Sequence, residues 1–128
     1  MISSILLAAG QSKRMKGENK LTKKINGIPL IKHSINNILS SSIDELIIVL
    51  GYQKEVVENI IDKNDKIKII FNDQFKTVMA SSIKIGIKSL STKSEAFFIC
   101  LCDMPEINKE IYNKIFFLTH IVKLDHQF

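Results

Sequence analysis

Short apolar runs alternate with amphipathic segments along the chain, and this alternation constrains the fold more than any other feature. The runs have the length of buried strands, and the segments between them carry apolar residues at helical spacing. Alternating strands and helices favour right-handed crossovers between parallel strands. We therefore predict an α/β fold with a mostly parallel sheet that helices cover on both faces. The predicted strands are Ile5–Ala9, Leu46–Leu50, Ile67–Phe71 and Ala96–Cys102.

Four helices are predicted between and after these strands. The first follows Pro29, because proline suits the first turn of a helix, and its apolar positions continue to Leu39. The others are Val56–Ile61, Met79–Leu90 and Ile111–Leu118, and His120–Leu124 resembles the start of a further strand. A chain of 128 residues with 45% apolar residues has enough apolar surface for one core, so a single domain is expected.

A polar, basic stretch follows the first predicted strand. That strand stops at Gly10, which allows a sharp turn and a close approach of the backbone to a ligand. Arg14 in this stretch is the sole arginine among 18 basic residues. A planar guanidinium can bind a phosphate group through two parallel hydrogen bonds, whereas an ammonium is a point charge. Together with Lys13 and Lys20, this pattern predicts a polyphosphate-binding loop; the structural alternative is an ordinary turn with solvated lysines.

Polar residues also follow the later strands. Gly51 comes after the second, Asn72 and Asp73 after the third, and Asp103 after the fourth. In a parallel sheet these positions share the carboxyl edge, where ligands bind in α/β folds. A carboxylate there can hold Mg²⁺, so Asp103 is the candidate metal ligand. Its structural alternative is a cap on the next helix.

Ser81 and Ser82 precede an apolar helical segment and have two interpretations. Serine is common at helix starts, where its hydroxyl caps the backbone, and it is equally suited to contact a base or ribose. The sequence leaves both roles open.

The charge and composition of the chain limit the classes of ligand and partner that we expect. The 18 basic and 13 acidic residues give a net charge of +5, which favours anionic ligands. The lysines are spread out without interleaved aromatic residues, so no nucleic-acid partner is expected. No apolar run approaches the roughly 18 residues of a membrane span, so no membrane partner is expected. Cys100 and Cys102 are interpreted as reduced core residues, and a cytoplasmic protein is expected.

Four blocks of sequence, in order, resemble a known family. Leu7–Met15 reads L-A-A-G-x-S-x-R-M and is followed by Asn19-Lys20-Leu21. The other three blocks are Gly27–Leu30, Met79–Lys84 and Cys102–Pro105. This pattern is similar to that of the molybdenum cofactor cytidylyltransferases, within the MobA-like NTP transferases. The blocks span nearly the whole chain.

The resemblance implies a three-layer, Rossmann-like nucleotidyltransferase fold and a Mg²⁺-dependent reaction. A cytidylyltransferase of this kind transfers CMP from CTP to molybdopterin and releases pyrophosphate, with a molybdoenzyme as a possible recipient of the product. Ala9 favours CTP, because the guanylyl branch of the family tends towards L-A-G-G at this place. The alternatives are a guanylyl or sugar-phosphate nucleotidyltransferase, or a nucleotide-binding module without catalysis.

The resemblance also implies roles for individual residues. Arg14 and Lys20 would bind the triphosphate and act in catalysis together with Asp103, the magnesium ligand. The nucleotide-binding set is Leu7, Ala8, Ala9, Gly10, Ser12, Arg14, Lys20, Asp73 and Ser82.

Two departures from the family pattern, together with the length of the chain, lower the enzymatic activity that we expect. Lys16 and Val78 occupy positions where the family usually has glycine, and a side chain would strain a site that needs glycine's backbone freedom. The family domain is also longer than this chain. Residues 1–128 are therefore expected to hold the nucleotide-binding portion, with the C-terminal acceptor portion absent and activity weak.

Overall fold

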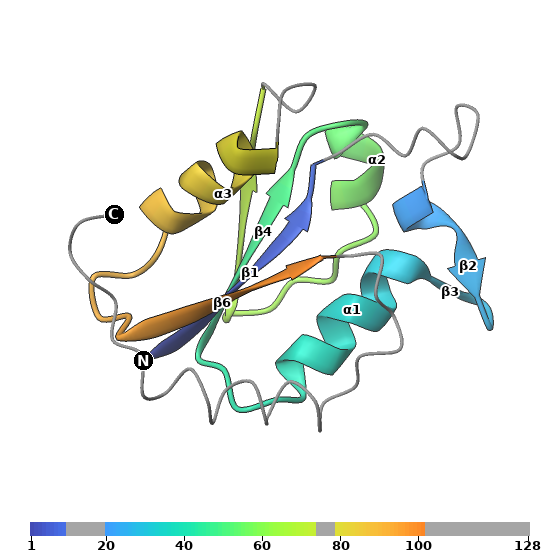
Figure 1. The fold of residues 1–128 in the computed structure, drawn as a ribbon. Coiled ribbons are helices and arrows are strands. Elements are labelled where there is room, and N and C mark those ends of the chain that lie inside the picture. Colours follow the sequence, from blue (N-terminus) through green and yellow to red (C-terminus); the bar gives the residue numbers. More distant parts are fainter. Residues whose placement is uncertain (10–19, 74–78, 102–128) are drawn as a thin grey trace.

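The four predicted strands form one parallel sheet. The computed structural model describes residues 1–9, 20–73 and 79–101 (Figure 1). The order of the strands across the sheet is β5-β4-β1-β6, and every neighbouring pair is parallel. This arrangement confirms the predicted α/β class. The strand bounds are β1 (Ile2–Ala8), β4 (Glu45–Leu50), β5 (Ile67–Phe71) and β6 (Ala96–Leu101).

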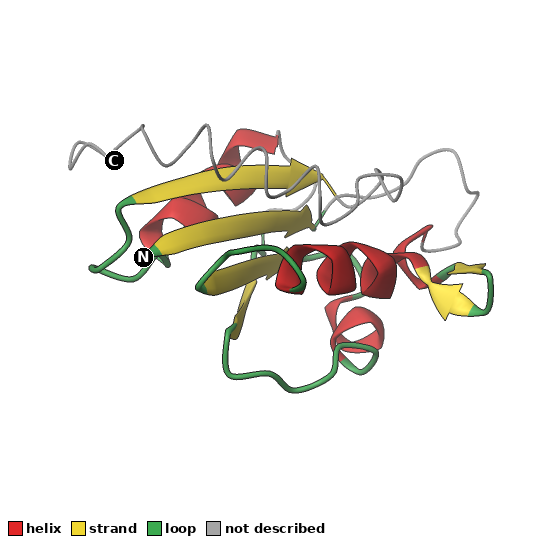
Figure 2. Cartoon of the chain, turned by 90° about the horizontal axis from the view of Figure 1, so that it is seen from below, coloured by secondary structure: helices red, strands yellow, loops and turns green. Residues whose placement is uncertain are grey.

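Helices cover both faces of the sheet and make three layers. Figures 1 and 2 show α1 (Leu30–Leu39) and α2 (Lys54–Glu58) on one side of the sheet and α3 (Met79–Lys88) on the other. The chain passes from β1 through α1 to β4 and through α2 to β5. It then returns across the opposite face through α3 to β6, which pairs with the free side of β1. The predicted three-layer nucleotidyltransferase fold is confirmed.

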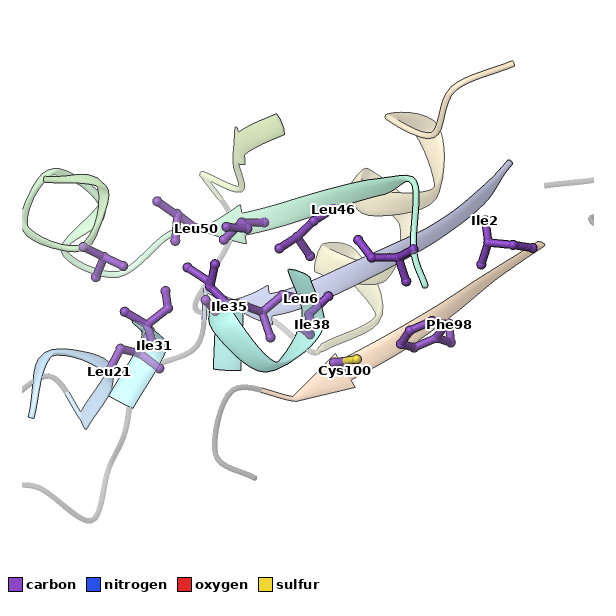
Figure 3. Close-up of a cluster of buried hydrophobic side chains, with 14 of the residues drawn as sticks. Ile2, Leu6, Leu21, Ile31, Ile35, Ile38, Leu46, Leu50, Phe98 and Cys100 are labelled. Carbon is purple, nitrogen blue, oxygen red and sulfur yellow. The ribbon is translucent and has the colours of Figure 1, made fainter. Parts of the chain in front are cut away.

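Two clusters of apolar side chains hold the layers together. Successive residues of a strand point to opposite faces, so β4 buries Leu46, Ile48 and Leu50 under α1 and α2, and Ile47 and Val49 under α3. All five are fully buried. Figure 3 shows the larger cluster, in which α1 side chains lie over β1, β4 and β6. Because both faces of β4 are covered, its sequence is a continuous apolar run rather than an alternating one.

The first strand begins earlier than its apolar pattern indicated. β1 starts at Ile2 rather than Ile5, because Ser3 and Ser4 continue the strand with side chains that are 0% exposed. The Ser3 hydroxyl donates to Glu45 Oε1 over 2.8 Å, so this polar group is satisfied inside the fold. A polar residue with an internal hydrogen-bond partner can continue a buried strand, so the apolar pattern alone places the start of β1 too late.

A short hairpin, which the apolar pattern does not predict, precedes α1. β2 (Lys24–Ile25) pairs in antiparallel fashion with β3 (Ile28–Pro29). Asn26 and Gly27 join them with φ angles of 54° and 80°. Both values are left-handed, and Asn-Gly is a strong signal for such a two-residue turn. Pro29 therefore ends β3 and precedes α1 instead of lying in its first turn.

Some other boundaries also differ from the predictions. α2 spans Lys54–Glu58 instead of Val56–Ile61, and the two isoleucines after it still pack against the larger core cluster. α3 ends at Lys88, two residues before the predicted end. The predicted helix at Ile111–Leu118 and strand at His120–Leu124 lie outside the described residues.

Candidate functional site

The carboxyl ends of the four strands meet in register at one edge of the sheet. Ala8 is paired with Leu50, and Leu50 is paired with Phe71 on the next strand. On the other side of β1, Leu7 is paired with Leu101. The strand ends from which the next segments of the chain continue therefore lie side by side. These segments hold most of the residues that the sequence assigns to a ligand site.

The fold reverses direction at this edge, between β1 and β6. From β1 the chain builds strands to one side through α1 and α2, and it returns to the opposite side of β1 through α3. Loops that leave such a pair of strands diverge to opposite faces of the sheet, and ligands of open α/β sheets bind in the crevice between them. The predicted polyphosphate-binding loop begins directly after β1, at this point.

Main-chain hydrogen bonds join the strand ends beyond the regular ladder. Tyr52 N donates to the carbonyl oxygen of Ala9 over 3.1 Å, and Asn72 N donates to the carbonyl oxygen of Leu50 over 2.7 Å.

Three of the candidate nucleotide-binding residues lie at the end of β1. Leu7, Ala8 and Ala9 are 8%, 3% and 2% exposed and pack in the two core clusters. The side chains of these three candidate nucleotide-binding residues therefore serve the core, and a ligand at this edge would meet their backbone.

A side-chain amide links β5 to the first turn of α3. Asn72 Nδ2 donates to Ser81 Oγ over 3.0 Å and to Ser82 Oγ over 2.8 Å. α3 already includes Met79, so both serines lie inside the helix and not at its cap, the first of the two roles that the sequence left open. Ser82 is 7% exposed, and its role in ligand binding stays a prediction.

The remaining candidates are distributed between described and undescribed parts of the chain. Asp73 is exposed and follows Asn72 directly after β5. Lys20 begins the 3-10 helix η2 (Lys20–Thr22), where the structure describes its backbone. The candidates outside the described residues are Gly10, Ser12, Arg14 and Asp103. Lys16 and Val78, which stand where the family usually has glycine, also lie outside them.

Two features of this edge were not singled out from the sequence. Asn72 was noted only for its position after a strand, and its bonds to Ser81 and Ser82 depend on how β5 packs beside α3. Lys54 Nζ lies 5.0 Å from the centre of the Phe71 ring, and Phe71 is 40% exposed. The sequence signal available for the Asn72 bonds is the order Asn-Asp after an apolar run. The contact between Lys54 and Phe71 has no such signal, because the two residues are far apart in sequence.

The described residues, 1–9, 20–73 and 79–101, contain neither a group of metal ligands nor a membrane-spanning helix. Within these ranges no three His, Cys, Asp or Glu side chains are grouped closely enough to hold a metal ion. The helices there are also all too short or too polar to cross a bilayer. The predicted magnesium ligand Asp103 lies outside the ranges.

Curated relatives of the chain include the bifunctional protein GlmU of Acholeplasma laidlawii. The two sequences are 38% identical over 72 residues, which cover 56% of this chain and 15% of that protein. The GlmU of Staphylococcus epidermidis is 27% identical over 105 residues, 81% of this chain and 23% of the relative. The chain thus spans less than a quarter of the length of these relatives.

Solved structures share the fold over most of this chain. A nucleotidyl transferase from Methanothermobacter thermautotroptrophicus has a TM-score of 0.81 and 24% identity, over 90% of this chain and 56% of that one. A manganese complex of Rv0371c from Mycobacterium tuberculosis has a TM-score of 0.72 and 16% identity, over 91% and 58%. A CTP:phosphocholine cytidylyltransferase from Streptococcus pneumoniae has a TM-score of 0.64 and 24% identity, over 80% and 45%. At these identities the likeness shows the fold.

The family itself is established by a match along almost the whole sequence. The MobA-like NTP transferase domain matches residues 4–120, which include most of β1, the basic loop, the β5–α3 connection and the Cys102–Pro105 block. The resemblance found in the sequence is confirmed at this level, and its narrower cytidylyltransferase branch stays a proposal. By this match, the chain belongs to the MobA-like NTP transferase domain family.

Proposed function

We propose that residues 1–128 form the nucleotide-binding portion of a nucleotidyltransferase that uses CTP. The observation that carries this proposal is the register of the strand ends, since Ala8, Leu50 and Phe71 bring the start of the basic loop and Asp73 to the same edge of one sheet. Family membership supports the same reaction class. The proposal concerns the nucleotide side of the reaction, because the chain covers 56% of the length of the Methanothermobacter enzyme.

Two observations favour CTP as the nucleotide. Ala9 gives the L-A-A-G form that the cytidylyl branch of the family usually carries. The Streptococcus pneumoniae enzyme that shares the fold is described as a CTP:phosphocholine cytidylyltransferase. GTP is the alternative that the guanylyl branch would use.

The acceptor in this proposal is an organic phosphate monoester. The motif blocks resemble the cytidylyltransferases that act on molybdopterin, and phosphocholine in the name of the Streptococcus enzyme belongs to the same chemical class. The terminal phosphate oxygen of such an acceptor attacks the α-phosphorus of CTP. A new phosphoanhydride bond forms as the bond to the leaving pyrophosphate breaks. Molybdopterin is the acceptor we propose, and a sugar phosphate is the alternative.

The residues of this chain would accelerate this reaction by positioning and by charge. Arg14 and Lys20 would bind the triphosphate, and the backbone after Ala9 would approach the nucleotide closely. Asp103 offers the hard carboxylate oxygens that Mg²⁺ prefers, and in the sequence it follows β6 by two residues. β6 pairs with β1, the strand that precedes the basic loop. When bound, the metal would offset the charge of the phosphate groups.

The direct test measures pyrophosphate release. The purified 128-residue chain is incubated with Mg²⁺, one of CTP, UTP, GTP or ATP, and one of molybdopterin, phosphocholine or glucosamine 1-phosphate. We expect pyrophosphate and a dinucleotide product with CTP and molybdopterin at a low rate, because the proposal assigns only the nucleotide-binding portion to this chain. Reactions without acceptor provide the background rate. Product from glucosamine 1-phosphate alone would replace the proposed acceptor by a sugar phosphate.

A non-catalytic nucleotide-binding module is the second candidate. It is favoured by Lys16 and Val78, which stand where the family usually has glycine. This candidate predicts CTP binding in a calorimetric titration without pyrophosphate release from any pair of substrates. Lys16→Gly and Val78→Gly variants would then gain activity if the side chains are what blocks the reaction.

A further inference from the structure

Asn72 makes more connections at the carboxyl edge than its position in the sequence suggests. Its side chain is 1% exposed, its backbone N donates to the Leu50 carbonyl oxygen, and its amide Nδ2 donates to Ser81 and Ser82. The residue thus joins three elements: β4 through its backbone, β5 through its place in the chain, and α3 through its amide.

The two amide bonds occupy both hydrogens of the asparagine NH₂ group. Each serine oxygen accepts one of them, so each serine hydroxyl hydrogen is directed to a group other than Asn72. Water cannot easily replace these bonds, because Asn72 and Ser82 are 1% and 7% exposed. Asn72 therefore holds the first turn of α3 against the end of β5 and occupies one acceptor position on each of its two hydroxyls.

The same amide bonds also brace Asp73, the next residue in the chain. Asp73 lies between Asn72 and the start of α3, and the hydrogen bonds connect the chain just before it with the chain after it. Asp73 is exposed, whereas Asn72 is buried, so the buried residue can hold its neighbour at the surface without itself contacting a ligand.

We infer that Asn72 is a positioning residue for the nucleoside part of the bound nucleotide, acting through Asp73 and the two serines of α3. This inference rests on the proposed function, because it assumes that a nucleoside triphosphate binds at this edge. The triphosphate part belongs to the basic loop with Arg14 in that proposal. Asn72 therefore affects recognition of the nucleoside and leaves recognition of the phosphate chain unchanged.

The test compares two ligands on the same variant. Asn72→Ala and the parent chain are titrated calorimetrically with CTP and with inorganic tripolyphosphate, each with Mg²⁺, well below the temperature of unfolding. We expect CTP affinity to fall about tenfold, because a loosened first turn must be ordered on binding. Tripolyphosphate affinity is expected to stay within twofold of the parent. Equal losses for both ligands, or no loss for CTP, would overturn the inference.

Ser3→Ala is the matched control at the opposite edge. Ser3 is 0% exposed and also makes two side-chain bonds, to Glu45 Oε1 and to Ser94 Oγ, each 2.8 Å long. Its replacement should lower the melting temperature comparably and leave CTP affinity unchanged. If Ser3→Ala weakened CTP binding as much as Asn72→Ala does, the effect would be one of general stability and the inference would fail.

A second comparison tests whether Asn72 acts through the serines. In a chain that already carries Ser81→Ala and Ser82→Ala, adding Asn72→Ala should change CTP affinity by less than about twofold, because coupled residues are not additive. A full additional tenfold loss of CTP affinity would contradict the proposal that Asn72 acts through the two serines.

The parent chain separates failure of the inference from failure of the proposed function. If the parent chain bound no nucleotide at all, the proposed function would fail and the inference with it. If the parent bound CTP and Asn72→Ala bound it equally well, the inference alone would fail.

Discussion

The two edges of the sheet use polar residues in opposite ways. At the amino edge, polar groups near the strand starts bond to one another. Glu45 Oε1 accepts from the Ser3 hydroxyl over 2.8 Å and from Ser91 N over 3.1 Å, and Asp44 Oδ2 accepts from Ile2 N over 2.8 Å. These groups tie β1, β4 and the segment before β6 together. The amino edge is therefore a structural feature of the fold.

At the carboxyl edge, by contrast, side-chain hydrogen bonding is concentrated in one described cluster. Asn72 bonds to Ser81 and Ser82, and the exposed carboxylate of Asp73 follows at once. The strands end in buried apolar residues such as Ala8 and Leu50, and the candidate charged residues belong to the segments beyond. Under the proposed function, we expect substitutions at the amino edge to change stability alone, and substitutions at the carboxyl edge to change ligand binding as well.

The largest expected effect that tests this comparison is at Asp103. Asp103→Asn keeps the shape of the side chain and removes its charge, so Mg²⁺-dependent pyrophosphate release should fall on the order of 100-fold while the melting temperature stays unchanged. Magnesium dependence is measured by titrating the metal at fixed CTP. An unaltered metal dependence would show that the ion is held by other residues.

Arg14→Lys should have the next largest effect. Lysine keeps the positive charge but lacks the two-pronged geometry of the guanidinium, so CTP affinity should fall about tenfold. Calorimetric titration measures the affinity, and Lys13→Arg is a matched control that alters the neighbouring cation without removing charge. Equal CTP affinities of Arg14→Lys and the parent would remove Arg14 from the site.

The smallest expected effect concerns Glu45 at the amino edge. Glu45→Ala removes the acceptor of two hydrogen bonds on a half-buried side chain and should lower the free energy of unfolding by about 1 kcal/mol. For a domain of this size that corresponds to a fall in melting temperature of about 4 °C. CTP affinity should not change. A weaker affinity in the folded variant would break the distinction between the two edges.

The fold was largely predictable because its apolar patterns are strong. The buried run of β4 and the spacing of Ile31, Ile35 and Ile38 on α1 indicate a strand and a helix without further context. The misses have local causes. The start of β1 is polar, and the Asn26-Gly27 turn joins two strands of two residues each, which are too short to form an apolar pattern.

The candidate site was predictable only in part. Topology alone places the end of β1 and Asp73 at one edge, because parallel strands share the direction of their carboxyl ends. The contact made by Ser81 and Ser82 was not predictable, since their hydrogen-bond donor, Asn72, lies just after β5, nine and ten residues away. Local propensity left a cap and a ligand contact equally open, whereas the packing of α3 beside β5 decided the contact that forms.

The sequence by itself determined the family, the α/β class and the places where charged residues interrupt the apolar pattern. These properties depend on residue type and spacing, which are local and additive along the chain. Only the tertiary structure decided that Asn72 joins β5 to α3 and that Ser3 and Glu45 close the opposite edge. Such bonds depend on strand register and helix placement, and the burial of the whole core sets both.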